Sequence, residues 1–447
     1  MEKHIVIIGA GPGGQEAALS AARQGAKITL IEQGELGGVC LNCGCVPSKT
    51  WLSSAHEFAS LKEISKYSTK EEELSSLAGS YDFSKIQQRR KNVILRFQKG
   101  LEFLYKNAKI NLIKGQAKIK DGKTVIVNNQ EITFDALILA CGSSAFYPPD
   151  LEKFKDKLLD NSTVFNLEKL PNSITILGGG AIGCEFACFF NALGIKVVLV
   201  EKLPAIALTL GQDISRAITT AFEKRGIEIK TGVGAKTLEI DGQTKTVLLE
   251  NGEKITSEEV LVALGRKVDL SALNLQALNI SYDKKGVKVN PQTMQLKDNI
   301  YAIGDITGLS LLAHAASAQA SAAVKHILNG EGSYDNNLIP AVLYTWPEAA
   351  SIGLTKEKAS FPVKSHKSFY LANARAVSQE QSEGFVQILT EETSSKIVGA
   401  QIFGAQAGEL IHIIALAMKH QMTLADLTEM TFAHPTLSEV IKEAALK

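Results

Sequence analysis

Cysteine is scarce in this chain, with 6 residues among 447. Half of them lie together between residues 40 and 45, whereas Cys141, Cys184 and Cys188 stand in apolar surroundings without the spacing of partners. Secreted domains that depend on disulfides carry a much denser framework. We therefore expect any disulfide in this protein to be functional rather than structural.

An excess of charge of one sign is also lacking, since 48 Lys and Arg residues balance 47 Asp and Glu residues. This balance provides no global field to hold a nucleic acid or an anionic membrane. The most apolar stretches, 181–200 and 309–328, are interrupted by charged residues, so neither is expected to span a bilayer. An apolar strand begins at His4 and leaves no room for a signal peptide, which predicts a cytoplasmic protein.

The length suggests about three domains, each large enough to bury its own core. With 45% hydrophobic and 21% charged residues, the composition is that of an ordinary globular protein.

A dinucleotide-binding pattern opens the chain. The apolar strand His4–Ile8 leads into a glycine loop and a helical pattern, and a second strand at 27–31 ends in Glu32. In this design Gly9 permits the tight turn, Gly11 lets the backbone approach a pyrophosphate, and Gly14 lets the helix pack close to the strand. Glu32 is then expected to accept hydrogen bonds from ribose hydroxyls.

The same pattern recurs at residues 173–201, with Gly178, Gly180 and Gly183 in the loop and Glu201 at the end of the second strand. The acidic residue follows the first glycine by 23 positions in both copies, from 9 to 32 and from 178 to 201. Two such sites on one chain favour a flavin enzyme that exchanges hydride with a nicotinamide cofactor. An acidic residue at position 201 repels a 2′-phosphate, which favours NAD over NADP.

The remaining pattern is mixed. A long helix is expected at 82–108 after a loop or frayed helix at 65–80, and strands are expected at 111–119, 124–127, 131–134 and 136–140. Residues 148–160 are interpreted as a linker because of two prolines and a charged run. From residue 339 onward, strands and helices without a third glycine fingerprint predict an α+β interface domain.

The crowded cysteines, Cys40, Cys43 and Cys45, have three possible explanations. They can form a redox-active disulfide, a metal knuckle, or a set of buried thiols that act as small apolar side chains. Structural zinc usually needs four ligands, and no second cysteine pair of this spacing exists, so no metal is expected. A zinc-binding scaffold without enzymatic activity stays as an alternative at this point.

Several motifs resemble those of the flavoprotein disulfide reductases and, among them, the dihydrolipoamide dehydrogenases. The similarity spans nearly the whole chain, with Cys43 as a departure from the pattern. The similar segments are residues 37–49 (GGVCLNCGCVPSK), 301–305 (YAIGD), 344–348 (YTWPE), 372–376 (ANARA) and 434–439 (HPTLSE).

The resemblance implies an α/β fold with two Rossmann-like dinucleotide-binding domains, for FAD and NAD, and a C-terminal α+β dimerisation domain. The implied limits are 1–147 for the FAD domain with its redox disulfide, 148–267 for the NAD domain, 268–336 for a return to the FAD domain and 337–447 for the interface domain. The implied cofactor-binding residues are Gly9, Gly11, Gly14, Glu32, Lys49, Gly142 and Asp305 for FAD, and Gly178, Gly180, Gly183, Glu185, Glu201 and Gly265 around NAD. Lys49 is expected against the flavin and paired with Glu185.

The resemblance also implies the chemistry. Cys40 and Cys45 form the redox disulfide, and His434 with Glu439 is the general base that deprotonates a dithiol substrate. The expected reaction is the oxidation of protein-bound dihydrolipoamide with NAD. Expected partners are a second copy of the chain, in a homodimer with shared sites, and lipoyl-bearing proteins of 2-oxo acid dehydrogenase complexes. The alternative is a related reductase, similar to glutathione or mercuric reductases, that uses NAD(P)H.

Overall fold

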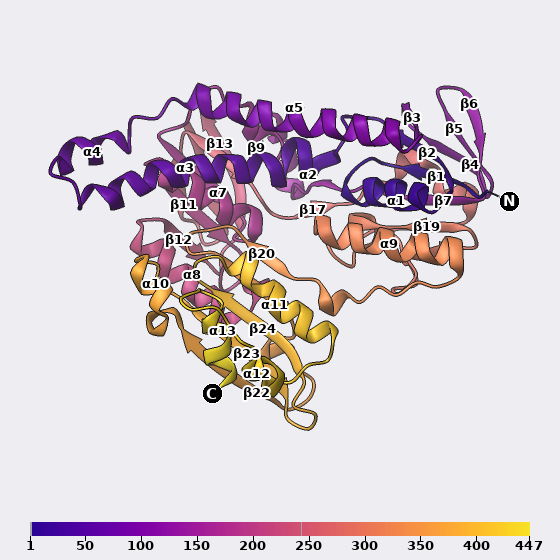
Figure 1. Cartoon of the computed structure of the whole chain (residues 1–447). Coiled ribbons are helices and arrows are strands. Elements are labelled where there is room, and N and C mark those ends of the chain that lie inside the picture. Colours follow the sequence, from indigo (N-terminus) through magenta and orange to yellow (C-terminus); the bar gives the residue numbers. More distant parts are fainter. Residues whose placement is uncertain (1, 243) are drawn as a thin grey trace. The chain divides into compact units, whose positions relative to one another are not determined.

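The computed structural model describes residues 2–242 and 244–447, and their contacts divide the chain into two units (Figure 1). The first unit combines the chain up to Thr50 with Ser84–Phe146 and Gly265–Asn336. The second unit combines Trp51–Phe83, Tyr147–Leu264 and Asn337–Lys447. Each unit thus gathers segments that lie far apart in the sequence.

A six-stranded sheet is the frame of the first unit. Its strand order is β18, β19, β7, β1, β2 and β3, with parallel pairing except between β18 and β19. Both central strands are almost entirely apolar, as expected where helices or strands cover both faces of a parallel sheet. The strands are β1 (His4–Ile8), β2 (Lys27–Glu32), β3 (Asn111–Lys114), β7 (Ala136–Leu139), β18 (Gln295–Lys297) and β19 (Ile300–Ala302).

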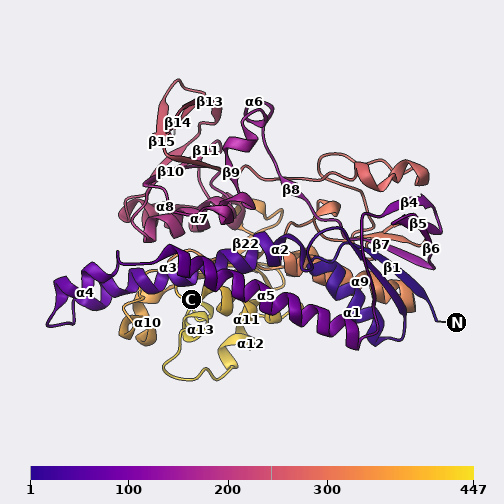
Figure 2. The ribbon, with the colours of Figure 1, turned by 90° about the horizontal axis from the view of Figure 1, so that it is seen from above.

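Helices and a small sheet cover the two faces of this frame. Helix α1 (Pro12–Arg23) lies beside helix α9 (Ala313–Asn329) in Figure 1 and Figure 2. On the opposite face, Val6 and Ile8 of β1 share a core with Ile119 and Val125 of an antiparallel sheet. That sheet consists of β4 (Lys118–Asp121), β5 (Thr124–Val127) and β6 (Gln130–Thr133).

The single strand expected at 111–119 is wrong, because the chain changes sheets within it. Strand β3 pairs with β2, whereas β4 pairs with β5. The break lies at Gly115, whose N–H donates to the Glu32 carbonyl at 2.9 Å. A side chain there would place its Cβ 2.5 Å from Asn128 Oδ1, so glycine permits the crossing.

Helices α2 (Gly38–Cys43), α3 (Cys45–Ser65) and α5 (Phe83–Asn107) complete the N-terminal part of the chain. Between α3 and α5, the stretch expected to be a loop or frayed helix contains the short, exposed helix α4 (Glu71–Leu77).

A five-stranded parallel sheet organises the first half of the second unit. Its strand order is β12, β11, β10, β16 and β9. The strands are β9 (Leu159–Asp160), β10 (Ser173–Leu177), β11 (Lys196–Glu201), β12 (Glu228–Thr231) and β16 (Glu259–Val262). Helices α7 (Ala181–Ala192) and α8 (Gln212–Lys224) pack on it, and β13 (Ala235–Asp241), β14 (Thr244–Leu249) and β15 (Lys254–Ser257) form an antiparallel sheet beside it.

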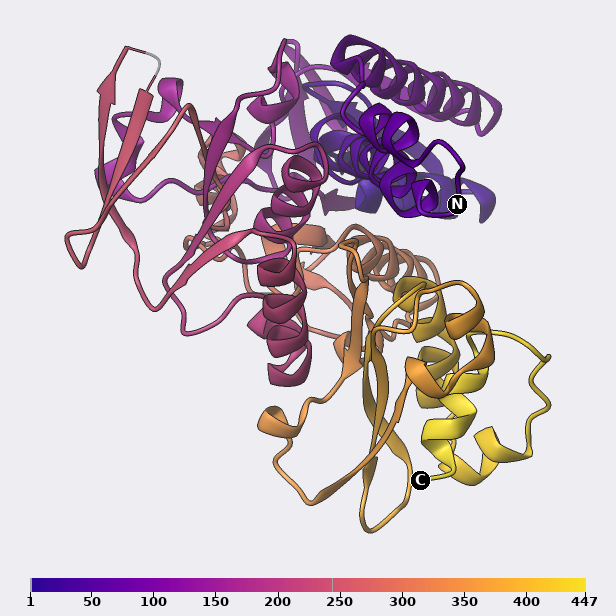
Figure 3. The same cartoon turned by 90° about the vertical axis from the view of Figure 1, so that its left-hand side faces the viewer.

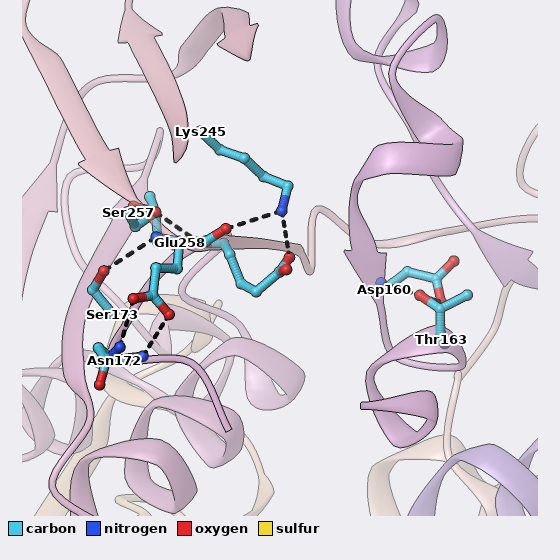
Figure 4. A network of polar contacts seen from close by, with 9 residues as sticks. Asp160, Thr163, Asn172, Ser173, Lys245, Ser257 and Glu258 are labelled. Atoms are coloured by element: carbon cyan, nitrogen blue, oxygen red, sulfur yellow. Dashed lines mark hydrogen bonds and ion pairs between the residues drawn. The ribbon is translucent and has the colours of Figure 1, made fainter. Parts of the chain in front are cut away.

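Residues 148–160 are not a simple linker, which corrects the prediction. After the short helix α6 (Pro149–Glu152), the chain adds β9 to the edge of the parallel sheet. Asp160 then closes a turn, because its Oδ1 accepts from Ser162 N at 2.8 Å and from Thr163 N at 2.9 Å. Figure 4 labels Asp160 and Thr163. The sequence did not predict this strand, because it is only two residues long and follows a charged run typical of a linker.

The start of β16 is anchored by a polar network (Figure 4). The Glu258 carboxylate accepts from the backbone N and the Nδ2 of Asn172, at 2.8 and 2.6 Å. Lys245 Nζ donates to the Glu258 carbonyl at 2.9 Å, which ties β14 to the same point. These bonds fix the register of β16 beside β10, where the second glycine loop begins.

An antiparallel sheet of five strands forms the C-terminal half of the second unit (Figure 3). Its strand order is β20 (Ala341–Leu343), β21 (Ala349–Gly353), β24 (Ile397–Phe403), β23 (Phe385–Glu391) and β22 (Val363–Phe369). Helices α11 (Ala407–Lys419), α12 (Leu424–Glu429) and α13 (Glu439–Ala445) share an apolar core with one face of this sheet. The short helix α10 (Ala374–Ser378) follows β22.

Candidate active site

The first glycine loop joins β1 to α1 through a backbone contact too close for any side chain. A Cβ on Gly14 would lie 1.8 Å from the Gly9 carbonyl oxygen. Gly9 itself has φ +104°, and its Cβ would lie 2.3 Å from Ala140 O. A Cβ on Gly11, by contrast, would meet no atom within 4 Å. The loop therefore presents open space at the N-terminus of α1, where backbone N–H groups can face a pyrophosphate.

The second glycine loop repeats this geometry between β10 and α7. A Cβ on Gly183 would lie 1.8 Å from Gly178 O, and Gly178 has φ +108°. Gly180 at the N-cap of α7 again has open space around it. Both loops therefore have the shape that a dinucleotide requires.

Each loop is fixed by the acidic residue at the end of the second strand. Glu32 Oε2 accepts from Ala10 N at 2.6 Å, and its Oε1 accepts from Gly34 N at 2.7 Å. Glu201 makes the equivalent pair of bonds, with Gly179 N at 2.6 Å and Leu203 N at 2.8 Å. Because a carboxylate has about four lone-pair positions, each acid keeps capacity to accept from a ribose diol.

Asp305 lies in the first unit with two residues that the sequence did not identify. Its carboxylate accepts from the Ser143 hydroxyl and forms an ion pair with Arg266 Nε at 3.5 Å. Arg266 Nε also donates to Ser143 Oγ at 2.7 Å. The sequence did offer a way to find them. Ser143 directly follows Gly142 and Arg266 directly follows Gly265, and both glycines were expected to bind cofactor.

Those two glycines also have the left-handed backbone that suits a close approach. Gly142 has φ +68° and Gly265 has φ +108°, and a Cβ on either would meet nothing within 4 Å. The adjoining strands β8 (Ser144–Ala145) and β17 (Arg266–Lys267) pair antiparallel, and Phe146 N donates to Gly265 O at 3.0 Å.

The thiols of Cys40 and Cys45 lie together where α2 meets α3. Gly44 between them makes this possible, because a Cβ there would lie 2.8 Å from Val39 O and 3.1 Å from Cys40 Cα. Cys40 is partly buried and Cys45 is exposed. A hydrogen bond with Cys45, and then burial, raise the pKa of Cys40, while the charge of Lys49 lowers it.

Cys43 is the last residue of α2 and is partly buried. Its neighbour Asn42 anchors this helix by donating to Leu36 O and Gly38 O, both at 2.9 Å. Gln98 of α5 donates in turn to Asn42 Oδ1 at 2.8 Å. Within the described chain, no cluster of three or more His, Cys, Asp or Glu side chains is arranged to hold a metal ion.

His434 and Glu439 form a hydrogen-bonded pair at the start of α13. His434 Nδ1 lies 3.0 Å from Glu439 Oε1, and 72% of the histidine side chain is exposed. The second carboxylate oxygen, Oε2, accepts from Thr436 N at 2.8 Å. The Thr436 amide first, and then His434, lower the pKa of Glu439, so this carboxylate is ionised wherever an imidazole titrates. The other ring nitrogen, Nε2, is therefore the one that can interact with a substrate.

Glu185 is buried on α7, where its Oε1 accepts from Tyr344 N at 3.2 Å. Its expected partner, Lys49, belongs to the other unit, and the pairing of the two stays a prediction.

Residues 3–320 match the family described as pyridine nucleotide-disulphide oxidoreductase, and residues 339–445 match its dimerisation domain. The chain belongs to this family. Dihydrolipoyl dehydrogenases from Chlamydia muridarum and Geobacillus stearothermophilus are 36% and 35% identical to it, over 99% and 100% of this chain and 96% of each relative. The crystal structure of LpdA from Mycobacterium tuberculosis is 25% identical, covers 99% of both chains and superimposes with a TM-score of 0.92.

Membership of the pyridine nucleotide-disulphide oxidoreductase family makes this protein an oxidoreductase and decides against the zinc scaffold. The predicted α/β class, with two Rossmann-like domains and a C-terminal α+β domain, is confirmed. The dimerisation domain makes it a homodimer. The described residues include no helix that is both long and apolar enough to cross a membrane.

Gly180 gives a direct test of the second loop as the nicotinamide site of this oxidoreductase. Because the backbone of Gly180 has φ −76° and open space, Gly180→Ala should fold normally. The added methyl should stand where the pyrophosphate approaches, and we expect the KM for NAD to rise by about 10-fold or more. Steady-state kinetics and flavin absorbance measure this, with Gly122→Ala as a control in equally open space. An unchanged KM for NAD would contradict the assignment.

Proposed function

We propose that the protein is a dihydrolipoyl dehydrogenase that oxidises protein-bound dihydrolipoamide and reduces NAD. The observation that carries this proposal is the combination of two pairs, the Cys40 and Cys45 thiols and the His434–Glu439 hydrogen bond, on one chain. The first pair suits electron exchange with a dithiol, and the second suits its deprotonation. The similarity to dihydrolipoyl dehydrogenases over the full chain supports the same substrate.

FAD and NAD fit the two glycine loops, each of which leaves space at a helix N-terminus. Gly11 and Glu32 would hold the diphosphate and ribose of FAD, and Gly180 and Glu201 those of NAD. When bound, FAD accepts two electrons from a dithiol and passes them to NAD as hydride. Glu201, as an acid at the ribose position, favours NAD over NADP.

The first chemical step needs a base, because the thiolate and not the thiol attacks a disulfide. His434 takes the proton from one substrate thiol, and Glu439 stabilises the imidazolium that results. The substrate thiolate then attacks Cys40 Sγ of the oxidised pair, and Cys45 leaves as a thiolate. The second substrate sulfur then attacks the first and displaces Cys40 Sγ, and the proton of the second substrate thiol passes to Cys40, which leaves as a thiol. Substrate leaves as a disulfide, and its two electrons remain on the cysteine pair, where bound FAD would be able to accept them.

His434 and Cys40 belong to different units of the chain. We propose that the active site is shared, so that His434 of the partner subunit serves the cysteine pair of the other chain. The dimerisation domain supports this, because it includes His434. A two-fold homodimer then has two equivalent shared sites.

Lipoyl-bearing proteins of 2-oxo acid dehydrogenase complexes are the proposed partners. The domain limits 1–147, 148–267, 268–336 and 337–447 are proposed as well. They are supported by the separate sheets, since the six-stranded sheet gains β18 and β19 from the segment after residue 267.

Two parallel assays test the proposed activity against its alternative. With dihydrolipoamide and NAD, we expect saturable formation of NADH, because His434–Glu439 supplies the base and Glu201 the NAD ribose site. With glutathione disulfide and NADPH, we expect a rate lower by about 100-fold or more. Turnover only in the second assay would reject the proposed function in favour of a glutathione-reductase-like enzyme.

Hybrid dimers test the shared site. Cys45→Ser and His434→Ala chains should each be inactive alone, since each lacks one half of every site. A hybrid of the two contains one complete site, and we expect about half of the wild-type activity with dihydrolipoamide. Differently tagged chains allow the hybrid to be purified and its composition verified by mass spectrometry. Verified hybrids without activity would show that the two halves come from one chain.

A further inference from the structure

Asn373 connects the segment before α10 to the loop that carries His434. This side chain is buried, with 1% of its surface exposed. Its Oδ1 accepts from Ala376 N at 3.0 Å and so caps α10. Its Nδ2 donates to Thr436 O at 3.0 Å, across 63 positions of sequence. The oxygen and the nitrogen of this buried amide are therefore both hydrogen-bonded, the oxygen to α10 and the nitrogen to the loop before α13.

The second bond leads directly to the proposed base. Thr436 N donates to Glu439 Oε2 at 2.8 Å, and Glu439 Oε1 lies 3.0 Å from His434 Nδ1. Thr436 Oγ1 also donates to Ala433 O at 2.7 Å, which closes the loop on itself. A continuous series of hydrogen bonds thus runs from Asn373 through Thr436 and Glu439 to His434.

We propose that Asn373 is a positioning residue for the His434–Glu439 pair, acting through the backbone of Thr436. This inference rests on the proposed function, in which that pair deprotonates the dithiol. The hydrogen bonds of Asn373 go to Thr436 and Ala376, so its role is to fix where the loop holds His434 and Glu439.

The loop needs such a support because the His434 side chain is mostly exposed and so is held by few packing contacts. Residues 430–438 connect α12 to α13 without regular structure, and the His434 side chain is 72% exposed. Leu437 is buried in the core of the C-terminal sheet, and Lys442 Nζ donates to Met430 O at 3.1 Å. Asn373 attaches the loop at a third point, Thr436. Of the three points, Thr436 is the one whose backbone N–H also bonds the Glu439 carboxylate. A misplacement of about 1 Å in a catalytic group can cost about 100-fold in rate.

The charge state of the pair depends on the same backbone. The Thr436 amide is the largest cause that lowers the pKa of Glu439, ahead of His434 and the Lys442 charge. If Thr436 moves, Glu439 loses its fixed donor and its orientation toward the imidazole. The carboxylate then stabilises the protonated ring less.

Substitutions of Asn373 can separate this role from simple capping of α10. Asn373→Ser keeps an oxygen that suits an N-cap but lacks an N–H group that can reach Thr436. Asn373→Asp keeps the size and the cap, and it donates to Thr436 O only when its carboxyl is protonated. Ser368→Ala is the matched control, because it removes another hydrogen bond from a buried side chain to α13, from Ser368 Oγ to Glu443 Oε2 at 3.2 Å.

For Asn373→Ser in the FAD-loaded dimer, we expect kcat with dihydrolipoamide and NAD to fall by about 10-fold or more, with KM changing less. The acid limb of the pH profile should move to lower pH, as in Glu439→Gln. For Asn373→Asp, activity relative to wild type should rise as the pH is lowered. Ser368→Ala should stay within about 2-fold of wild type.

Reduction of ferricyanide by NADH should be unchanged in every variant, because it needs the flavin and the nicotinamide but no thiol base. Equal profiles for Asn373→Ser, Asn373→Asp and Ser368→Ala would overturn the inference, and so would a parallel loss of ferricyanide reduction. His434→Ala distinguishes failure of the proposed function from failure of the role of Asn373. If wild type is inactive with dihydrolipoamide, or if His434→Ala is fully active, the proposed function fails. If His434→Ala is inactive but Asn373→Ser is not, only the inference fails.

Discussion

The contact of a glycine with a carbonyl oxygen is the constraint on which both nucleotide sites depend. A Cβ on Gly14 or on Gly183 would lie 1.8 Å from the carbonyl oxygen of Gly9 or Gly178. Without a Cβ, the helix can start directly against the strand, and its free N–H groups face the end of the sheet. The glutamates at the ends of β2 and β11 then fasten each loop through two backbone amides. The same solution appears twice in the chain, and an enzyme with two dinucleotide cofactors needs it twice.

The Cys40–Cys45 and His434–Glu439 pairs depend on local turns instead, because in each pair the two residues are only five positions apart in the chain. Gly44 brings Cys45 against Cys40, and the turn at Thr436 brings Glu439 against His434. In both cases a neighbouring group controls the proton. Cys45 raises the pKa of Cys40, and the Thr436 amide lowers the pKa of Glu439. Thiol–disulfide exchange needs a thiolate, and in the proposed reaction the carboxylate-oriented base produces one from the substrate.

The sequence was sufficient wherever a function depends on local spacing. The two glycine fingerprints, and the pair of His434 and Glu439 five positions apart, could be identified from spacing and from the family resemblance. Spacing could not show that Gly115 sends the chain into a second sheet or that 159–160 form an edge strand, because each depends on pairing with a distant segment. The Asp305–Arg266–Ser143 group and the Asn373–Thr436 bond were missed for the same reason.

The central claim is that electrons pass from the dithiol to the Cys40–Cys45 pair and from Cys45 to the flavin. Anaerobic reduction of the purified protein by two electrons from dihydrolipoamide tests it most directly, with absorbance recorded at long wavelength. We expect a thiolate-to-flavin band in wild type and no such band in Cys45→Ser, because that variant lacks the thiolate proposed to interact with bound FAD. A band of full intensity in Cys45→Ser would contradict this account.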